Sequence, residues 1–271
     1  MMIGQTDLIE QFKSMTDDFP KFVILVGVKG SGKKTLAHEV CKLLGMNEYM
    51  VEDIKVDTIR SMINDAKRII EPTLYIIPDA DKMSNQAKNT MLKITEEPPN
   101  NAYFILTLED EHHVLGTIKS RGQMYKMKPY SPEIIHEFAK SVGISSLEET
   151  EIVLDICETP GEVKLLQQTG IISLYDYVAK VIDNIALVSG SNAFKIADML
   201  AIKDEPDKYD LKLFWKAFMK VCSDRLRTEK DVKYAYAIKV TSQYMQQLNI
   251  TGINRGATFD LWILYIRENW I

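Results

Sequence analysis

The stretch Phe22–Thr35, FVILVGVKGSGKKT, has the residue types and spacing of a phosphate-binding loop. Gly27, Gly32 and Lys33 meet the pattern G-x-x-x-x-G-K, in which the lysine ammonium reaches the β- and γ-phosphates of a nucleotide. The glycines permit backbone angles at which successive N–H groups point at one anion, and the following helix adds the positive end of its dipole. A chance glycine-rich turn is the alternative, and the strand and helix patterns on either side argue against it. The candidate phosphate-binding residues are Gly27, Lys29, Gly30, Ser31, Gly32, Lys33, Lys34 and Thr35.

The residue after Lys33 does not suit a magnesium site. The pattern requires Ser or Thr there, because its hydroxyl holds Mg²⁺, and this chain has Lys34. Thr35 does not replace it, since the next residue along a helix is turned by about 100°. Lys34 instead brings a second cation to a place that needs an oxygen ligand. We therefore expect no metal site and no required cofactor, and at most weak binding of phosphate or ATP without Mg²⁺.

Strand and helix patterns alternate on both sides of this loop. Apolar runs predict buried strands at Phe22–Val26, Thr73–Ile77 and Ala102–Leu108, with shorter strands within Asn47–Val56 and at Gln123–Met127. Helical spacing predicts helices at Met1–Phe19, at Leu36–Leu44 with Gly45 as its end, at Thr58–Ile70 with Asp57 as N-cap, and after the N-cap Ser84. Continuous apolar strands that alternate with helices indicate an α/β fold, with a parallel sheet covered on both faces.

The chain after Pro129 has helical patterns and no convincing strand. Ser131 and Pro132 begin one helix, Leu147–Cys157 and Gly161–Gln168 predict two more, and four or five segments follow from Ile171. We expect a sheet domain at residues 1–129, a small three-helix lid at 130–170 and a helical domain at 171–271. Breaks in the last domain are expected at Gly190, Asp204–Asp207 and Thr251–Gly256. Its expected core aromatic residues are Phe214, Trp215, Phe218, Trp262 and Tyr265.

Composition limits the classes of function. The 271 residues carry a formal net charge of −5, so any contact with nucleic acid must be local or shared with partner subunits. The cysteines Cys41, Cys157 and Cys222 lie far apart and are odd in number, which excludes a zinc ribbon and indicates a reducing compartment. The N-terminus does not read as a signal peptide, and no apolar run approaches the length of a membrane span. We expect a cytoplasmic protein that does not enter a membrane.

Six stretches taken together resemble the clamp-loader branch of the AAA+ proteins. Their order and spacing match that family as far as about Met127, and TPGEVKLL at Thr159–Leu166 is similar to the family's lid. The stretches are GVKGSGKKT, IKVDTIRSMI (Ile54–Ile63), YIIPDADKMS (Tyr75–Ser84), NTMLKITEEPP (Asn89–Pro99), FILTLED (Phe104–Asp110) and TIKSRGQ (Thr117–Gln123). The resemblance implies an AAA+ sheet domain with a helical lid and a collar-like C-terminal domain, in a subunit of a DNA polymerase III sliding-clamp loader.

The chain departs from the family's motor subunits in groups that hydrolyse ATP. Their second acidic motif ends in Asp-Glu, which holds Mg²⁺ and activates water, whereas this chain has Pro78 and Asp79. The sensor position falls near Leu108 or Glu109, and the lid arginine corresponds to Gly161 or Glu162. The family's zinc module after the first helix is replaced by the short link Gly45–Val56. The resemblance therefore implies a subunit deficient in hydrolysis, with Asp79 at the edge of a degenerate nucleotide site.

Ser120 and Arg121 match the family's Ser-Arg-Cys element, with Gly122 in place of the cysteine. In the family this element places an arginine finger into the ATP site of the neighbouring subunit, and such fingers are worth roughly 10³–10⁵ in rate. The alternative for Arg121 is a surface ion pair. The resemblance thus implies a catalytic role in trans for Arg121, supported by Ser120. The implied partners are the motor subunits of a hetero-oligomer, a delta subunit, and a sliding clamp and primed DNA met through the assembly.

Other charged groups have simpler explanations. Helix capping and packing account for Glu96 and Glu97, and a solvated helix face accounts for Lys82, Lys88 and Lys93, although these lysines could also face DNA.

Two further functions stay open. One is an active AAA+ motor in which Thr35 or an unexpected carboxylate restores the metal site, and the other is a stand-alone P-loop kinase or nucleotide-binding regulator.

Overall fold

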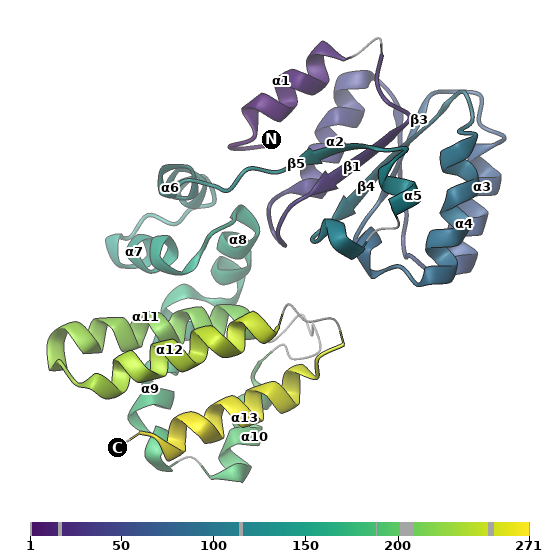
Figure 1. Ribbon diagram of the computed structural model, residues 1–271. Coiled ribbons are helices and arrows are strands. Elements are labelled where there is room, and N and C mark those ends of the chain that lie inside the picture. Colours follow the sequence, from purple (N-terminus) through teal and green to yellow (C-terminus); the bar gives the residue numbers. More distant parts are fainter. Residues whose placement is uncertain are drawn as a thin grey trace. The chain divides into compact units, whose positions relative to one another are not determined.

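The computed structural model describes residues 2–15, 18–113, 116–187, 189–200, 209–248 and 252–270. Its contacts divide the chain into two compact units (Figure 1). The first unit is Met1–Ile134 with Thr159–Gly161, and the second is Ile135–Glu158 with Glu162–Ile271. The division between lid and collar expected at residue 170 stays a prediction.

The first unit is built on a five-stranded parallel sheet. Its strand order is β2-β3-β4-β1-β5, and every pair of neighbouring strands is parallel. The strands are β1 (Phe22–Val26), β2 (Asn47–Met50), β3 (Thr73–Ile77), β4 (Ala102–Leu108) and β5 (Gln123–Lys126). Since all strands run the same way, the residues that follow β1, β3 and β4 meet at one edge of the sheet. The predicted parallel α/β fold is confirmed.

Helices cover both faces of the sheet, as its apolar strands require. On one face, α1 (Thr6–Ser14) and α2 (Lys33–Leu44) pack on side chains such as Val23 and Leu25. On the other face, α3 (Val56–Ala66), α4 (Asn85–Glu96) and α5 (Gly116–Lys119) pack on Ile24 and Phe104. Figure 1 shows α3 and α4 side by side over this second face. The alternate residues of β1 thus supply both halves of the core.

The ends of the helices test the predicted caps. Ser84 caps α4 by accepting the N–H of Ala87, and Gly45 ends α2 at a φ of 63°, so both predictions are confirmed. The cap predicted at Asp57 is wrong, because α3 begins at Val56 and Asp57 lies in its first turn. Asp53 fixes this entry instead, since its carboxylate accepts the Lys55 N–H and the Thr58 hydroxyl.

Two helices of the first unit are shorter than predicted. The first helix covers Thr6–Ser14 rather than Met1–Phe19, although its stripe residue Phe12 is buried as expected. The third ends at Ala66 rather than Ile70, and the Ile70 side chain is 87% exposed. In both cases apolar residues after the last helical turn fit the helical spacing of the sequence, but they lie outside the helix.

The second unit is helical throughout its described residues, apart from one isolated bridge between Leu200 and Tyr209. The short 3-10 turns among the described residues of both units are η1 (Ala80–Lys82), η2 (Glu111–His113) and η3 (Ile185–Leu187). From the start of the helical part, the helices are α6 (Pro132–Ser141), α7 (Leu147–Ile156), α8 (Pro160–Thr169), α9 (Ile171–Asp183), α10 (Gly190–Asp198), α11 (Leu211–Glu229), α12 (Val232–Gln247) and α13 (Arg255–Glu268). The break predicted at Asp204–Asp207 lies outside the described residues. No described helix has the length and apolarity that crossing a bilayer requires.

The aromatic core of this unit lies on α11 and α13. Four of the five aromatic residues expected there, Phe214, Trp215, Phe218 and Trp262, are fully buried. Trp262 also donates its indole N–H to Thr241 at 3.0 Å, which satisfies a buried donor. The prediction is wrong for Tyr265, which is 44% exposed and stacks on Tyr236 with ring centres 6.3 Å apart.

Candidate functional site

The phosphate loop joins the end of β1 to the start of α2, as the sequence predicts. Gly30 and Gly32 have φ values of 81° and 86°, which favour glycine. A methyl group built on Gly27 would lie 2.7 Å from Met127 Cγ and 2.8 Å from Ser31 Oγ, so only glycine fits there. The loop therefore adopts the backbone conformation that its glycines predict.

Lys33 points into its own loop. Its ammonium donates to the carbonyl oxygens of Gly27 at 2.5 Å and Val28 at 3.0 Å, and the side chain is buried. Burial lowers the pKa of Lys33, and the carboxylates of Glu109 and Asp79 partly oppose that shift. The group expected to hold the β- and γ-phosphates thus binds two carbonyl oxygens of the loop.

Segments distant in the sequence pack over the loop. The Gly161 N–H donates to the Gly30 carbonyl at 3.0 Å, and a methyl group on Gly161 would collide with Gly30 Cα and lie 2.9 Å from its oxygen. The Tyr130 hydroxyl donates to the Ser31 carbonyl at 2.6 Å. A methyl group on Gly32 would lie 3.0 Å from Met2 Cε. We name Met2, Tyr130 and Gly161 the loop cover.

Sequence reasoning missed the loop cover. It identified Gly161 only as a departure from the lid arginine, and it gave Tyr130 no role. The available signal was a glycine directly after Pro160 in the first turn of a helix, where glycine costs about 1 kcal/mol relative to alanine. Such a residue usually marks a close approach of two backbones.

Lys34 and Asp79 meet at the carboxyl edge of the sheet. The Lys34 ammonium lies 3.8 Å from the Asp79 carboxylate, and both side chains are partly exposed. Asp79 has a φ of 49°, a left-handed conformation uncommon for a residue other than glycine, and its N–H donates to the hydroxyl of buried Thr107 at 3.1 Å. Thr35 is exposed. Among the described residues, no three His, Cys, Asp or Glu side chains lie close enough together to hold a metal ion.

Ser120 and Arg121 lie away from the phosphate loop. They line a cavity of about 290 Å³ that also contains Pro20, Lys21 and Phe22, which precede or begin β1. The loop follows the other end of that strand, about 13 Å away at 3.3 Å per residue. The structure brings Asp79 to the loop, and it leaves Ser120 and Arg121 at the opposite edge of the sheet.

Two acceptors hold the Arg121 guanidinium. Its Nη1 donates to the Thr117 carbonyl at 2.9 Å and its Nη2 to the Glu96 carboxylate at 3.1 Å, with the side chain 35% exposed. The Ser120 hydroxyl donates to the same Thr117 carbonyl at 3.0 Å. A methyl group on Gly122 would lie 2.8 Å from Ile24 Cδ1, which explains the small residue in the third position. The sequence did not indicate the contact between Glu96 and Arg121.

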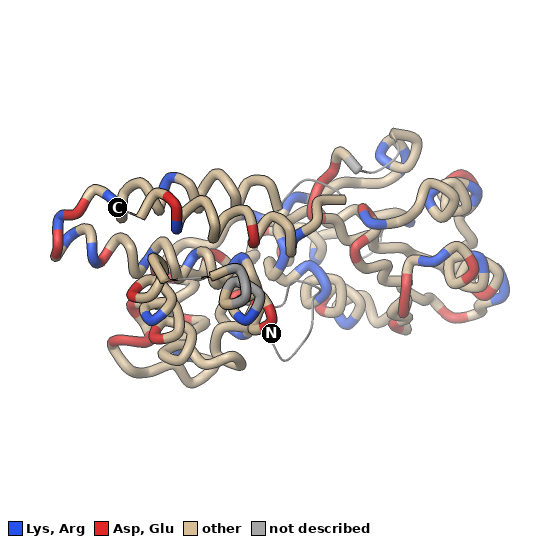
Figure 2. Tube along the Cα trace, turned by 90° about the horizontal axis from the view of Figure 1, so that it is seen from below, with Lys and Arg blue, Asp and Glu red and all other residues tan. Residues whose placement is uncertain are grey.

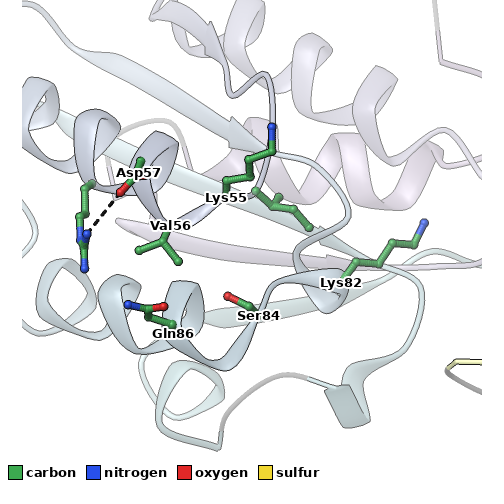
Figure 3. Close-up of a pocket in the computed structure, with 8 residues that line it drawn as sticks. Lys55, Val56, Asp57, Lys82, Ser84 and Gln86 are labelled. Carbon is green, nitrogen blue, oxygen red and sulfur yellow. Dashed lines mark hydrogen bonds and ion pairs between the residues drawn. The ribbon is translucent and has the colours of Figure 1, made fainter.

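A second pocket lies between α3 and α4, with a volume of about 570 Å³ (Figure 3). Its lining includes Lys55, Arg60 and Lys82, and each has a carboxylate within 4 Å. Asp57 lies in the first turn of α3 and pairs with Arg60 of the same helix at 3.3 Å, and the dashed line from Asp57 in Figure 3 marks this ion pair. Over the whole chain, acidic and basic residues are interspersed (Figure 2). The pocket is therefore an ion-paired surface with little excess charge.

Comparison with known proteins gives matches to subunits of DNA polymerase III. Residues 46–131 match the family model described as DNA polymerase III, delta subunit. The DNA polymerase III subunit delta' of Haemophilus influenzae is 32% identical over 123 residues, which are 44% of this chain and 36% of that protein. The delta' subunit of Bacillus subtilis is 39% identical over 64 residues, which are 24% and 20% of the two chains. The matches span less than half the length of these relatives.

Solved structures of low identity share the fold over a greater length. A DNA polymerase III gamma subunit-related protein of Thermotoga maritima has a TM-score of 0.56 at 16% identity, with 97% of this chain and 99% of that chain covered. A RuvB mutant of the same organism has a TM-score of 0.51 at 13% identity, with 84% and 78% covered. The likeness shows an α/β AAA+ fold.

Proposed function

We propose, from the premise that this chain resembles the clamp-loader branch of the AAA+ proteins, that it is a delta-prime-like subunit of a DNA polymerase III clamp loader. In this proposal it turns over no ATP of its own and supplies Arg121 to the ATP site of a neighbouring motor subunit. Its further partners are a delta subunit, and the sliding clamp and primed DNA through the assembly, in the cytoplasm. No cofactor is required.

The interior of the phosphate loop supports the absence of turnover. A nucleotide would have to displace the Lys33 ammonium from two carbonyl oxygens and separate Gly161 from Gly30. Lys34, 3.8 Å from Asp79, places an ammonium beside the carboxylate at the position where a motor subunit has the glutamate that activates water. Any binding of phosphate or ATP is weak in this proposal and needs no Mg²⁺, since the available cations are lysines.

The position of Arg121 carries the proposal. An arginine at the opposite end of β1 from its own phosphate loop cannot reach a nucleotide there. It is partly exposed and presents a planar guanidinium, so it suits a phosphate presented by another chain. A guanidinium in such a place stabilises the charge that develops on the transferred phosphoryl group.

The experiment is an ATPase assay of an assembly reconstituted from this chain and the motor subunits. Arg121→Ala is expected to lower turnover at the adjoining site by about 10³-fold or more, in line with other arginine fingers. Arg68→Ala is the matched control, because Arg68 is an exposed arginine of the same unit, just after α3, and does not line the cavity that contains Arg121. Equal turnover for the two variants would refute the finger. Turnover by the isolated chain that Lys33→Ala abolishes would favour an active motor instead.

A further inference from the structure

We infer that Glu96 is a positioning residue for Arg121, an inference that rests on the proposed function. Its carboxylate accepts from Nη2 of the guanidinium at 3.1 Å, while the Thr117 carbonyl accepts from Nη1 at 2.9 Å. The two acceptors hold both tips of the side chain. The Nε–H and one further N–H on each terminal nitrogen stay available for a phosphate.

Both acceptors stand on ordered elements. Glu96 is the last residue of α4, and the preceding Thr95 is buried. Thr117 belongs to α5, whose Ile118 is buried against the sheet and accepts the Arg121 N–H through its carbonyl at 3.2 Å. A free arginine side chain carries about 2 kcal/mol of rotamer entropy, and an arginine held before the reaction loses less of it in the transition state. We therefore expect the hydrogen bond between Arg121 and Glu96 to raise the rate of ATP hydrolysis in the neighbouring subunit.

A surface ion pair without catalytic consequence is the competing explanation, since Glu96 is 56% exposed and such pairs contribute little to stability. The adjacent Glu97 separates the two explanations. It is also exposed and carries the same charge, but its side chain has no hydrogen bond or ion pair among the described residues. A general effect of surface charge would be equal for both glutamates, whereas positioning of Arg121 requires Glu96 alone.

The test uses the reconstituted assembly with variants of this chain. Glu96→Ala is expected to lower kcat at the adjoining site by about fivefold with KM unchanged, which equals about 1 kcal/mol at 1.36 kcal/mol per tenfold. Glu96→Gln, which keeps an acceptor oxygen, is expected to restore part of that loss. Glu97→Ala is expected to leave kcat within error of the parent. In the Arg121→Ala background, Glu96→Ala is expected to have no additional effect, because its action passes through the arginine.

Three results would overturn the inference while the proposed function stands. The first is equal kcat values for Glu96→Ala and Glu97→Ala. The second is a loss of kcat from Glu96→Ala that persists in the Arg121→Ala background. The third is a rise in kcat for Glu96→Ala, which would mean that Glu96 competes with the phosphate for the guanidinium. If Arg121→Ala itself leaves the ATPase unchanged, the proposed function fails and the inference fails with it.

Discussion

Replacing Gly161 with alanine tests whether the first turn of α8 closes the phosphate loop. The added methyl group would collide with Gly30 Cα and lie 2.9 Å from the Gly30 oxygen and 3.1 Å from its carbonyl carbon. Carbon atoms in contact prefer separations of about 3.5–4.0 Å. The obstacle is backbone, so no side chain can rotate out of the way, and the two segments must separate.

The expected cost has two contributions. An extra methyl group in a packed site typically costs about 1–3 kcal/mol. Separation also weakens the 3.0 Å hydrogen bond from the Gly161 N–H to the Gly30 carbonyl, worth about 0.5–1.5 kcal/mol. Gly161→Ala is therefore expected to lower the free energy of unfolding by about 1.5–4.5 kcal/mol, measured by urea denaturation with circular dichroism.

Gly116→Ala is the matched control for this change. Gly116 begins α5, and a methyl group built on it meets nothing within 4 Å, so alanine is expected to be neutral or to stabilise by up to about 1 kcal/mol. Equal denaturation midpoints for the two variants would refute the close approach of Gly161 and Gly30, and with it the closed loop.

Two further substitutions test the charges around the loop and the entry of α3. Lys33→Met removes both hydrogen bonds of the ammonium, and of the two carbonyls the Val28 one keeps the Ser31 N–H as a donor. The substitution is expected to cost about 1–3 kcal/mol of the free energy of unfolding in urea denaturation without nucleotide, and a neutral result would indicate that Lys33 does not stabilise the loop. Asp53→Asn tests pH dependence, because hydrogen bonds from the Thr58 hydroxyl and the Lys55 N–H lower the pKa of Asp53 from 3.8 to about 2. A pKa that is lowered in the folded state contributes stability that is present above about pH 4 and is lost as the pH falls to about 2. Asp53→Asn is therefore expected to lose less stability than the parent across that interval. Parallel curves of unfolding free energy against pH for the two proteins would contradict this.

Local sequence patterns predicted most of the sheet. The runs TLYII and AYFILTL form strands at the expected residues, because apolar residues of β propensity end there at proline, glycine or polar residues. The cap at Ser84 was equally local. The cap at Asp57 failed because α3 begins at Val56, with Lys55 as its N-cap residue, and the folded turn places the Asp53 carboxylate on the Lys55 N–H and the Thr58 hydroxyl.

The candidate site was only half accessible from the sequence. The glycine spacing predicted the loop itself, and the resemblance identified Arg121. The sequence did not reveal where the Lys33 side chain points. It also did not reveal the contacts of the Tyr130 hydroxyl and the Gly161 backbone, since both residues contact loop residues about 100 positions or more away in the chain. The contact from Glu96 to Arg121 joins the end of α4 to the segment after α5, a proximity that no local pattern records.

The most direct test of the account is calorimetric titration of the isolated chain with ATP, first with Mg²⁺ and then with EDTA. The account predicts no heat that depends on Mg²⁺, because Lys33 binds the loop's own carbonyl oxygens and Lys34 stands beside Asp79. Lys33→Met is expected to leave the titration with Mg²⁺ unchanged. Saturable binding that requires Mg²⁺ and disappears in Lys33→Met would contradict the account.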